Sequence, residues 1–184
     1  MATVHLVLVR HAEAMEGSLF GDDSQRPLTQ RGQRDAHVVG RLRRMMAIPS
    51  PDIVFTSGFE RAEQTMERVL EGVPLRVIRD QNFSPEGSVK LGWEMILREA
   101  REPHGQDKSQ SNSAGSAEHL KSIWIVGHNP NIERLLGLIL PDYAVVLRPI
   151  RKCSLVWIKL RDVETHSPVP ELLAYLPRPS EERA

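Results

Sequence analysis

Four side chains in this sequence, those of Arg10, His11, Arg61 and His128, have the chemistry to bind and transfer a phosphoryl group. A guanidinium group binds phosphate oxygens through forked, charge-assisted hydrogen bonds that a lysine cannot reproduce. A neutral imidazole can attack phosphorus, and neighbouring cations favour its neutral form by lowering its pKa. Two arginines with two histidines therefore favour phosphoryl transfer over acyl transfer.

The sequence neighbourhood predicts different roles for the two histidines. His11 directly follows Arg10 at the end of an apolar run, so we expect it to be the nucleophile and to attack through one ring nitrogen. His128 is then expected to bind and neutralise the transferring oxygens. The loss of either arginine is expected to cost several kcal/mol of transition-state stabilisation.

Each of the four residues lies beyond a short apolar run that predicts a β-strand. These runs are residues 4–9, 52–55 and 123–126. Arg61 falls near the first turn of a helix predicted after the second run. Ligands of open α/β sheets bind at the carboxyl ends of the strands, where helix N-termini offer free amides. One such sheet would bring all four side chains together.

The rest of the pattern alternates between helices and strands. Helices are predicted from an N-cap at Thr29 to Met46, over residues 60–70, through Trp93 and Leu97, and from an Asn129-Pro130 start to Leu140. Further strands are predicted at residues 75–78, 153–160 and 172–176. This alternation predicts an α/β three-layer sandwich, with a mostly parallel central sheet flanked by helices.

Several other residues are given structural roles. His5 is expected to be a satisfied strand residue and Cys153 a core residue, whereas Arg41, Arg43 and Arg44 are expected to form a solvated helix face. Residues 103–119 carry almost no apolar side chains and predict a polar, mobile insertion. We expect residues 1–184 to form one domain around this insertion.

Composition limits the classes of partner. The chain has 184 residues, with 24 Lys and Arg balancing 24 Asp and Glu, so nothing global predicts binding to nucleic acid or to a membrane surface. A single cysteine excludes an intrachain disulfide and fits a reducing compartment. No apolar run is long enough to cross a membrane. We expect a cytoplasmic protein.

Other hydrolytic chemistries lack their motifs. No His-Glu-x-x-His cluster is present, which disfavours a metal hydrolase. A cysteine phosphatase needs an arginine six positions after its cysteine, but Lys159 stands six positions after Cys153. Neither a Gly-x-Ser-x-Gly elbow nor a phosphate-binding P-loop occurs.

Four segments in order resemble the histidine phosphatase superfamily, and within it the small SixA-type phosphohistidine phosphatases. The segments are Arg10-His11-Ala12, Arg26-Pro27-Leu28-Thr29, Arg61-Ala62-Glu63 and Gly127-His128-Asn129-Pro130. The resemblance implies a phosphoglycerate mutase-like fold, an intermediate phosphorylated on His11, and a phosphate pocket of Arg10, Arg61 and His128, to which we add Arg26. It also implies no metal, no cofactor and no inserted cap.

The chain departs from that family at the proton donor. Related sequences carry an acidic residue before a Ser-Pro or Thr-Pro turn, but here Asn82 precedes Phe83-Ser84-Pro85, and an amide cannot act as a general acid. Glu86 and Glu13 are the replacement candidates, although an exposed structural role is the simpler expectation for both. Solvent can protonate the remote nitrogen of a phosphorylated imidazole as it leaves, whereas an alkoxide has no such route. Asn82 therefore favours an N-phosphoryl substrate.

Together these observations predict a phosphohistidine phosphatase that removes phosphate from protein histidine. Two alternatives stay open: a phosphatase of small phosphorylated metabolites, and a catalytically impaired module that binds phosphoproteins. A mutase is less favoured, because handling phosphoglycerate would call for a larger enclosing cap.

Overall fold

One six-stranded sheet organises the protein. The structure is a computed structural model that describes residues 2–17, 21–102, 120–143, 149–165 and 167–179. The strands run in the order β3-β2-β4-β1-β5-β6. They are β1 Val4–Arg10, β2 Ile53–Thr56, β3 Val77–Arg79, β4 Lys121–Gly127, β5 Leu155–Arg161 and β6 Val169–Leu176. All contacts among β1 to β4 are parallel, whereas β5 is antiparallel to both β1 and β6, so the predicted mostly parallel sheet is confirmed.

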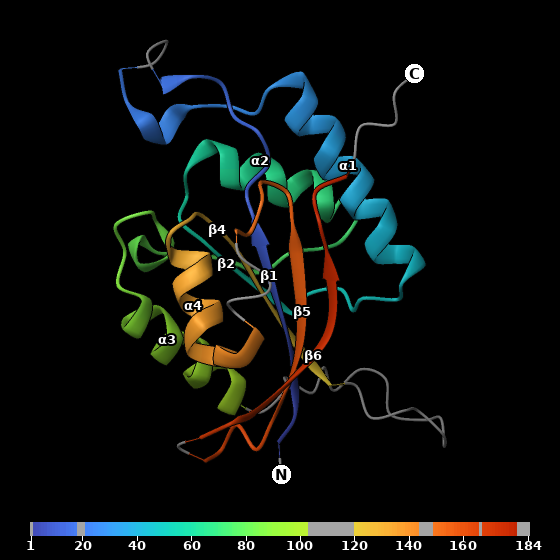
Figure 1. The fold of residues 1–184 in the computed structure, drawn as a ribbon, viewed down its shortest axis with the longest axis vertical. Helices are drawn as coiled ribbons and strands as arrows, with labels where there is room; N and C mark the ends of the chain where they lie inside the picture. The colour runs from blue at the N-terminus through green and yellow to red at the C-terminus, as the bar shows by residue number, and fades with distance from the viewer. Residues whose placement is uncertain (1, 18–20, 103–119, 144–148, 166, 180–184) are drawn as a thin grey trace.

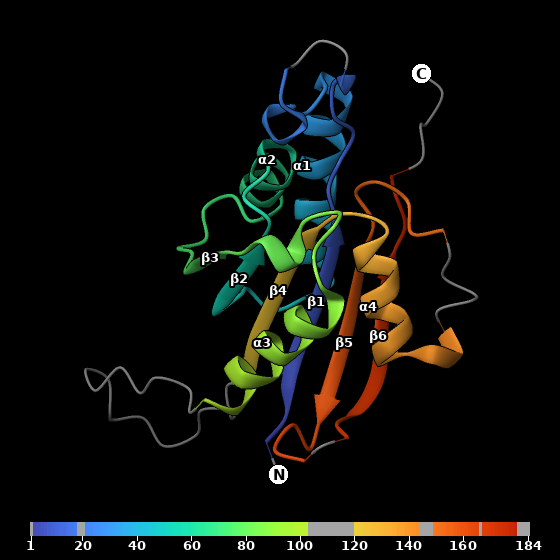
Figure 2. The same cartoon turned by 90° about the vertical axis from the view of Figure 1, so that its left-hand side faces the viewer.

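Helices cover both faces of this sheet, which gives the expected three layers (Figures 1 and 2). The helices are α1 Gln30–Met45, α2 Glu60–Val69, α3 Val89–Arg101 and α4 Asn131–Ile139, with 3-10 turns at Asp23–Gln25 and Gln81–Phe83. Helices α1 and α2 lie on one face, and α3 and α4 lie on the other (Figure 2). Thr29 caps α1 as predicted, because its side chain accepts a hydrogen bond from the Gly32 amide.

The alternation of side chains along β1 explains the two layers. Leu6 and Leu8 point into the core under α3 and α4, and Val7 and Val9 point into the core under α1 and α2. Every residue from Leu6 to Val9 is fully buried. A strand buried on both faces is apolar without interruption, which is the pattern that predicted a covered central strand.

Three sequence expectations need correction. Arg43 is buried instead of solvated: its Nε donates to the Val69 carbonyl at 3.1 Å and its guanidinium lies 5.8 Å from the Trp124 ring. Cys153 is buried as expected but precedes β5, in a turn where its φ is 62°. Helix α4 begins at Asn131, with Pro130 at the N-cap position.

Other expectations are confirmed or fall outside the described residues. His5 is satisfied, because the Trp157 indole N–H donates to its Nδ1 at 3.1 Å. Residues 103–119, the predicted insertion, lie outside the described part of the chain. That the whole chain is one domain stays a prediction. Among the described residues, no helix is long and apolar enough to cross a membrane.

Candidate active site

The register of the sheet brings the two histidines together. Arg10, the last residue of β1, pairs with Gly127, the last residue of the neighbouring parallel strand β4. His11 and His128 therefore leave adjacent strands at the same edge, and the His11 amide donates to the Gly127 carbonyl at 2.9 Å. The centres of the two imidazole rings lie 4.9 Å apart, and the ring planes are inclined at 52° to each other.

His11 is oriented so that one ring nitrogen stays available. Its Nδ1 lies 2.7 Å from the Ala12 carbonyl oxygen, which can only accept a hydrogen bond, so Nδ1 carries the proton. Nε2 of the neutral ring then has the free electron pair. Burial is the main cause that lowers the pKa of His11 to about 3, and the charges of Arg61 and Arg10 contribute, against the opposing effect of the Ala12 bond. At neutral pH this imidazole is therefore uncharged.

His128 is buried more deeply, with 1% of its surface exposed. Its Nε2 lies 2.7 Å from the Ser57 hydroxyl, and the Phe59 ring packs 5.0 Å away. Burial is the main cause that lowers the pKa of His128 to about 2, followed by the neighbouring His11. Its Nδ1 is buried and has no hydrogen-bond partner among the described residues.

A short relay of hydrogen bonds fixes Arg61 against the end of β1. The Ala12 amide donates to the Thr65 hydroxyl at 2.9 Å, and that hydroxyl donates to the Arg61 carbonyl at 2.6 Å. The guanidinium of Arg61 lies 4.8 Å from the Phe59 ring, which also contacts His128. Helix α2 thus holds Arg61 over the same site as the histidines.

Asp23, which sequence reasoning missed, occupies the guanidinium of Arg61. Nη1 of Arg61 donates to the Asp23 carbonyl at 2.6 Å, and Nη2 donates to its carboxylate at 2.8 Å. The other carboxylate oxygen accepts from Arg26 Nη1 at 2.7 Å. The hydrogen bond from Arg26 is the main cause that lowers the pKa of Asp23, and Arg61 lowers it further. The carboxyl group of Asp23 is therefore ionised. An anion therefore already lies between two arginines that we expected to bind phosphate.

Arg10 and Arg26 are both partly engaged with the backbone. Nη1 of Arg10 donates to the Ile150 carbonyl at 2.5 Å, while its buried Nε has no partner in the described part of the chain. Nε of Arg26 donates to the Met15 carbonyl at 2.7 Å, which anchors the loop after β1. Arg10 thus keeps a free donor, and Arg26 mainly holds the loop and Asp23.

The two candidate proton donors lie in different settings. Glu13 forms an ion pair with Arg178 at 3.0 Å and accepts from Thr29 at 3.1 Å, and Arg178 is the main cause that lowers its pKa. Glu13 is thus held as a structural carboxylate. Glu86 is exposed on a turn whose Ser84 and Gly87 carbonyls both accept from the Asn131 side chain.

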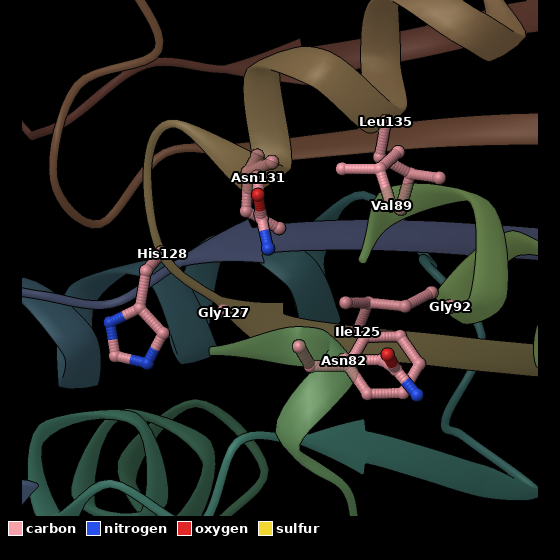
Figure 3. Close-up of a pocket in the computed structure, with 10 residues that line it drawn as sticks. Asn82, Val89, Gly92, Ile125, Gly127, His128, Asn131 and Leu135 are labelled. Carbon is pink, nitrogen blue, oxygen red and sulfur yellow. The ribbon is translucent and has the colours of Figure 1, made fainter. Parts of the chain in front are cut away.

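Asn82 lines a small, mainly apolar cavity together with His128 (Figure 3). The cavity holds about 20 Å³, room for about one water molecule. The Asn82 amide lies at the far end of this cavity from the imidazole and donates to the Met95 sulfur at 3.8 Å. The position where an acid was expected therefore turns its side chain toward α3.

Comparison with known protein families identifies the family of this chain. The sequence model of the histidine phosphatase superfamily (branch 1) matches residues 6–123. This chain belongs to the histidine phosphatase superfamily. The matched stretch includes Arg10, His11 and Arg61 and ends before His128. No curated protein matches the chain in sequence.

Solved structures share the fold of this superfamily member. A protein histidine phosphatase SixA complexed with tungstate has a TM-score of 0.72 at 18% identity, over 95% of this chain and 97% of its own. A SixA from Nakamurella multipartitia has a TM-score of 0.71 at 23% identity, over 98% and 99%. A phosphoglycerate mutase from Plasmodium falciparum has a TM-score of 0.63 at 17% identity, over 100% and 98%. At such identities these likenesses describe the fold alone.

Proposed function

We propose that this superfamily member is a metal-independent phosphohistidine phosphatase of the cytoplasm, acting on phosphorylated protein. The observation that carries this proposal is a buried, neutral His11 whose Nε2 has no hydrogen-bond partner among the described residues. The centre of its ring lies 4.9 Å from that of a second buried histidine, and two arginines lie beside it. The free thiol of Cys153 fits a reducing compartment.

The reaction runs in two displacements. Nε2 of His11 donates its electron pair to phosphorus, and the bond between phosphorus and the substrate imidazole breaks as solvent protonates the leaving ring. Water then attacks phosphorylated His11, gives up a proton to solvent, and releases inorganic phosphate with the neutral imidazole. Arg10, Arg61 and His128 bind the three phosphoryl oxygens in both steps.

Two unpaired buried nitrogen atoms near His11 support these roles. Nε of Arg10 and Nδ1 of His128 are both buried without a hydrogen-bond partner among the described residues. Buried polar atoms in proteins are almost always paired, and a phosphoryl oxygen would supply the acceptor that Arg10 lacks. A second one would accept from Nδ1 of His128 in the tautomer whose Nε2 accepts a hydrogen bond from the Ser57 hydroxyl. Phosphate binding would also replace the Asp23 carboxylate on Arg61, exchanging one anion for another.

The setting of the carboxylates favours an N-phosphoryl substrate. Asp23 lies beside the site but is kept ionised by Arg26 and Arg61, and Glu13 is paired with Arg178. Neither holds a proton to donate at neutral pH. An alkyl phosphate would leave as an unassisted alkoxide, whereas imidazole leaves with a proton from solvent.

Hydrolysis by the wild type and a His11→Ala variant tests the proposal. We expect phosphohistidine and phosphoramidate to be hydrolysed with rates that fall by at least about a thousandfold in the variant, since the nucleophile is lost. A simple alkyl phosphate should be hydrolysed far more slowly by the wild type. Equal, negligible rates in both proteins would instead indicate a module that only binds phosphoproteins. Rapid hydrolysis of alkyl phosphates would point to small metabolites as substrates.

A further inference from the structure

A strongly basic groove adjoins the candidate active site. It encloses about 530 Å³ and is lined by Arg10, Arg31, Pro149, Arg151, Lys152, Arg178 and Pro179. Five of these seven residues carry positive charge and none carries negative charge. Because the whole chain has a formal charge of zero, this concentration of cations is a local feature.

The backbone fixes two of the cations against the catalytic strand. Arg151 and Lys152 lie in the turn before β5, where the Cys153 amide contacts the carbonyls of Arg10 at 3.0 Å and His11 at 3.1 Å. The Ser154 amide closes this turn by donating to the Arg151 carbonyl at 3.1 Å. The turn is therefore hydrogen-bonded to the backbone of Arg10 and of His11, the proposed nucleophile.

Carboxylates partly neutralise two of the other cations, Arg31 and Arg178. Arg178 binds both Glu13 and Asp35 at 3.0 Å, and Arg31 lies 4.0 Å from Asp35. By contrast, the side chains of Arg151 and Lys152 form no hydrogen bond or ion pair with the residues that the structure describes. Burial is the main cause that lowers the pKa of Lys152, and Arg10 and Arg178 add to it against the attraction of Glu13. Cations that are not neutralised by carboxylates therefore lie in the turn before β5.

Arg10 is shared between the groove and the phosphate pocket. It lines the groove, and it directly precedes His11, whose pKa its charge lowers. An anionic group in the groove would therefore lie one side chain away from a phosphoryl group on His11. Two anions so close together are most simply carried by one substrate molecule.

We propose that this groove binds an acidic segment, rich in aspartate and glutamate, of the same protein whose phosphohistidine enters the site. The inference rests on the proposed function and specifies its substrate. The groove is open and its cations come from β1, α1, the turn before β5 and the segment after β6, so a single small anion would contact only part of it. Several carboxylates along an extended segment would contact more than one of these cations and give selectivity through charge complementarity.

Two phosphohistidine peptides that differ only in charge test this proposal. One peptide carries glutamate on both sides of the phosphohistidine, and the other carries glutamine. We expect the wild type to hydrolyse the glutamate peptide with a kcat/KM about tenfold higher at low salt, and this preference to shrink in high salt as the charges are screened.

Variants of the turn locate the effect. The double variant R151Q/K152Q should lose the preference for glutamate while its rate on phosphoramidate stays within about twofold of wild type. The matched control R41Q removes an exposed charge from the middle of α1 and should keep the preference. Equal kcat/KM for the two peptides, or an unchanged preference in the double variant, would overturn the proposal.

Failure of the proposed function gives a different result. If the wild type hydrolyses neither peptide nor phosphoramidate, the phosphatase assignment is wrong, and binding of the unphosphorylated glutamate peptide tests the groove alone. We then expect fluorescence anisotropy to show binding that the double variant loses. No binding, or a preference confined to small molecules with two phosphates, would overturn the acidic segment as the occupant.

Discussion

At the scale of residues, the neutral state of His11 follows from its surroundings. An imidazole in water is half-protonated near its ordinary pKa of 6.5, but burial and two nearby guanidinium groups lower the pKa of His11 to about 3. The Ala12 carbonyl fixes the tautomer and directs Nε2 into the site. The same arginines that would bind phosphate thus prepare the group that would attack it.

The carboxylate of Asp23 already binds Arg61, so we expect it to oppose phosphate binding. We expect Asp23→Asn to bind inorganic phosphate about five- to tenfold more tightly, because a dianion no longer meets a carboxylate on Arg61. The inhibition constant of phosphate in a phosphoramidate assay measures this change. Glu67→Gln, which removes an exposed carboxylate from the same helix that bears Arg61, is the control and should leave the constant unaltered. Weaker phosphate binding by Asp23→Asn would show that the carboxylate assists the site.

At the scale of elements, the turn before α3 directs the side chain of Asn82 toward that helix. Restoring an acid there should not restore ester hydrolysis, because the side chain at position 82 lies at the far end of the cavity from His128 and contacts Met95 (Figure 3). We expect Asn82→Asp to hydrolyse an alkyl phosphate no faster than wild type. We also expect its free energy of unfolding to be lower by about 1 kcal/mol, because a carboxylate needs a hydrogen-bond donor and the Met95 thioether cannot donate.

Steady-state rates and urea unfolding measure the two effects. Asn82→Ala, which also removes the amide but adds no acid, serves as the comparison for both. A tenfold gain on the alkyl phosphate in Asn82→Asp alone would mean that this turn reaches the leaving group after all.

The sequence predicted the elements whose information is local. Apolar runs marked the central strands, and His11 and His128 stand just beyond two of these runs. Their proximity followed from the rule that parallel strands end at one edge of the sheet. The capping of α1 by Thr29 was equally local, because the hydroxyl and the Gly32 amide are three residues apart.

Contacts between distant segments could not be predicted in the same way. Asp23 reaches Arg61 across 38 positions, and only the folded loop after β1 shows that they meet. Arg43 looked solvated on its helix, yet Trp124 and the Val69 carbonyl bury it. The basic groove combines Arg31, Lys152 and Arg178 from three separate regions of the sequence. The zero net charge of the chain does not predict such a local concentration of cations.

At the scale of the whole molecule, the buried histidines link stability to pH. The unfolded chain protonates both imidazoles near pH 6.5, but the folded protein does not do so until about pH 3 for His11 and about pH 2 for His128. Between these values the unfolded state binds more protons, so the free energy of unfolding falls as the pH falls. Each histidine contributes a slope of up to about 1.4 kcal/mol per pH unit.

Urea unfolding between pH 7 and pH 4.5 measures this linkage. The double variant H11Q/H128Q should lose less stability over this interval than wild type, because its glutamine side chains take up no proton. Arg41→Gln, which removes an exposed charge from α1 and no histidine, should follow the wild-type slope. Parallel curves for wild type and the double variant would mean that the two imidazoles are accessible to protons in the folded protein.

The central claim, that His11 is the nucleophile, is tested most directly by trapping the phosphorylated enzyme. The wild type is mixed briefly with phosphoramidate, denatured in base to preserve phosphohistidine, and mapped by mass spectrometry. We expect phosphate on His11 alone, because its Nε2 is free whereas Nε2 of His128 is bonded to Ser57. Phosphate on His128, or phosphate retained on the protein in the His11→Ala variant, would contradict this assignment.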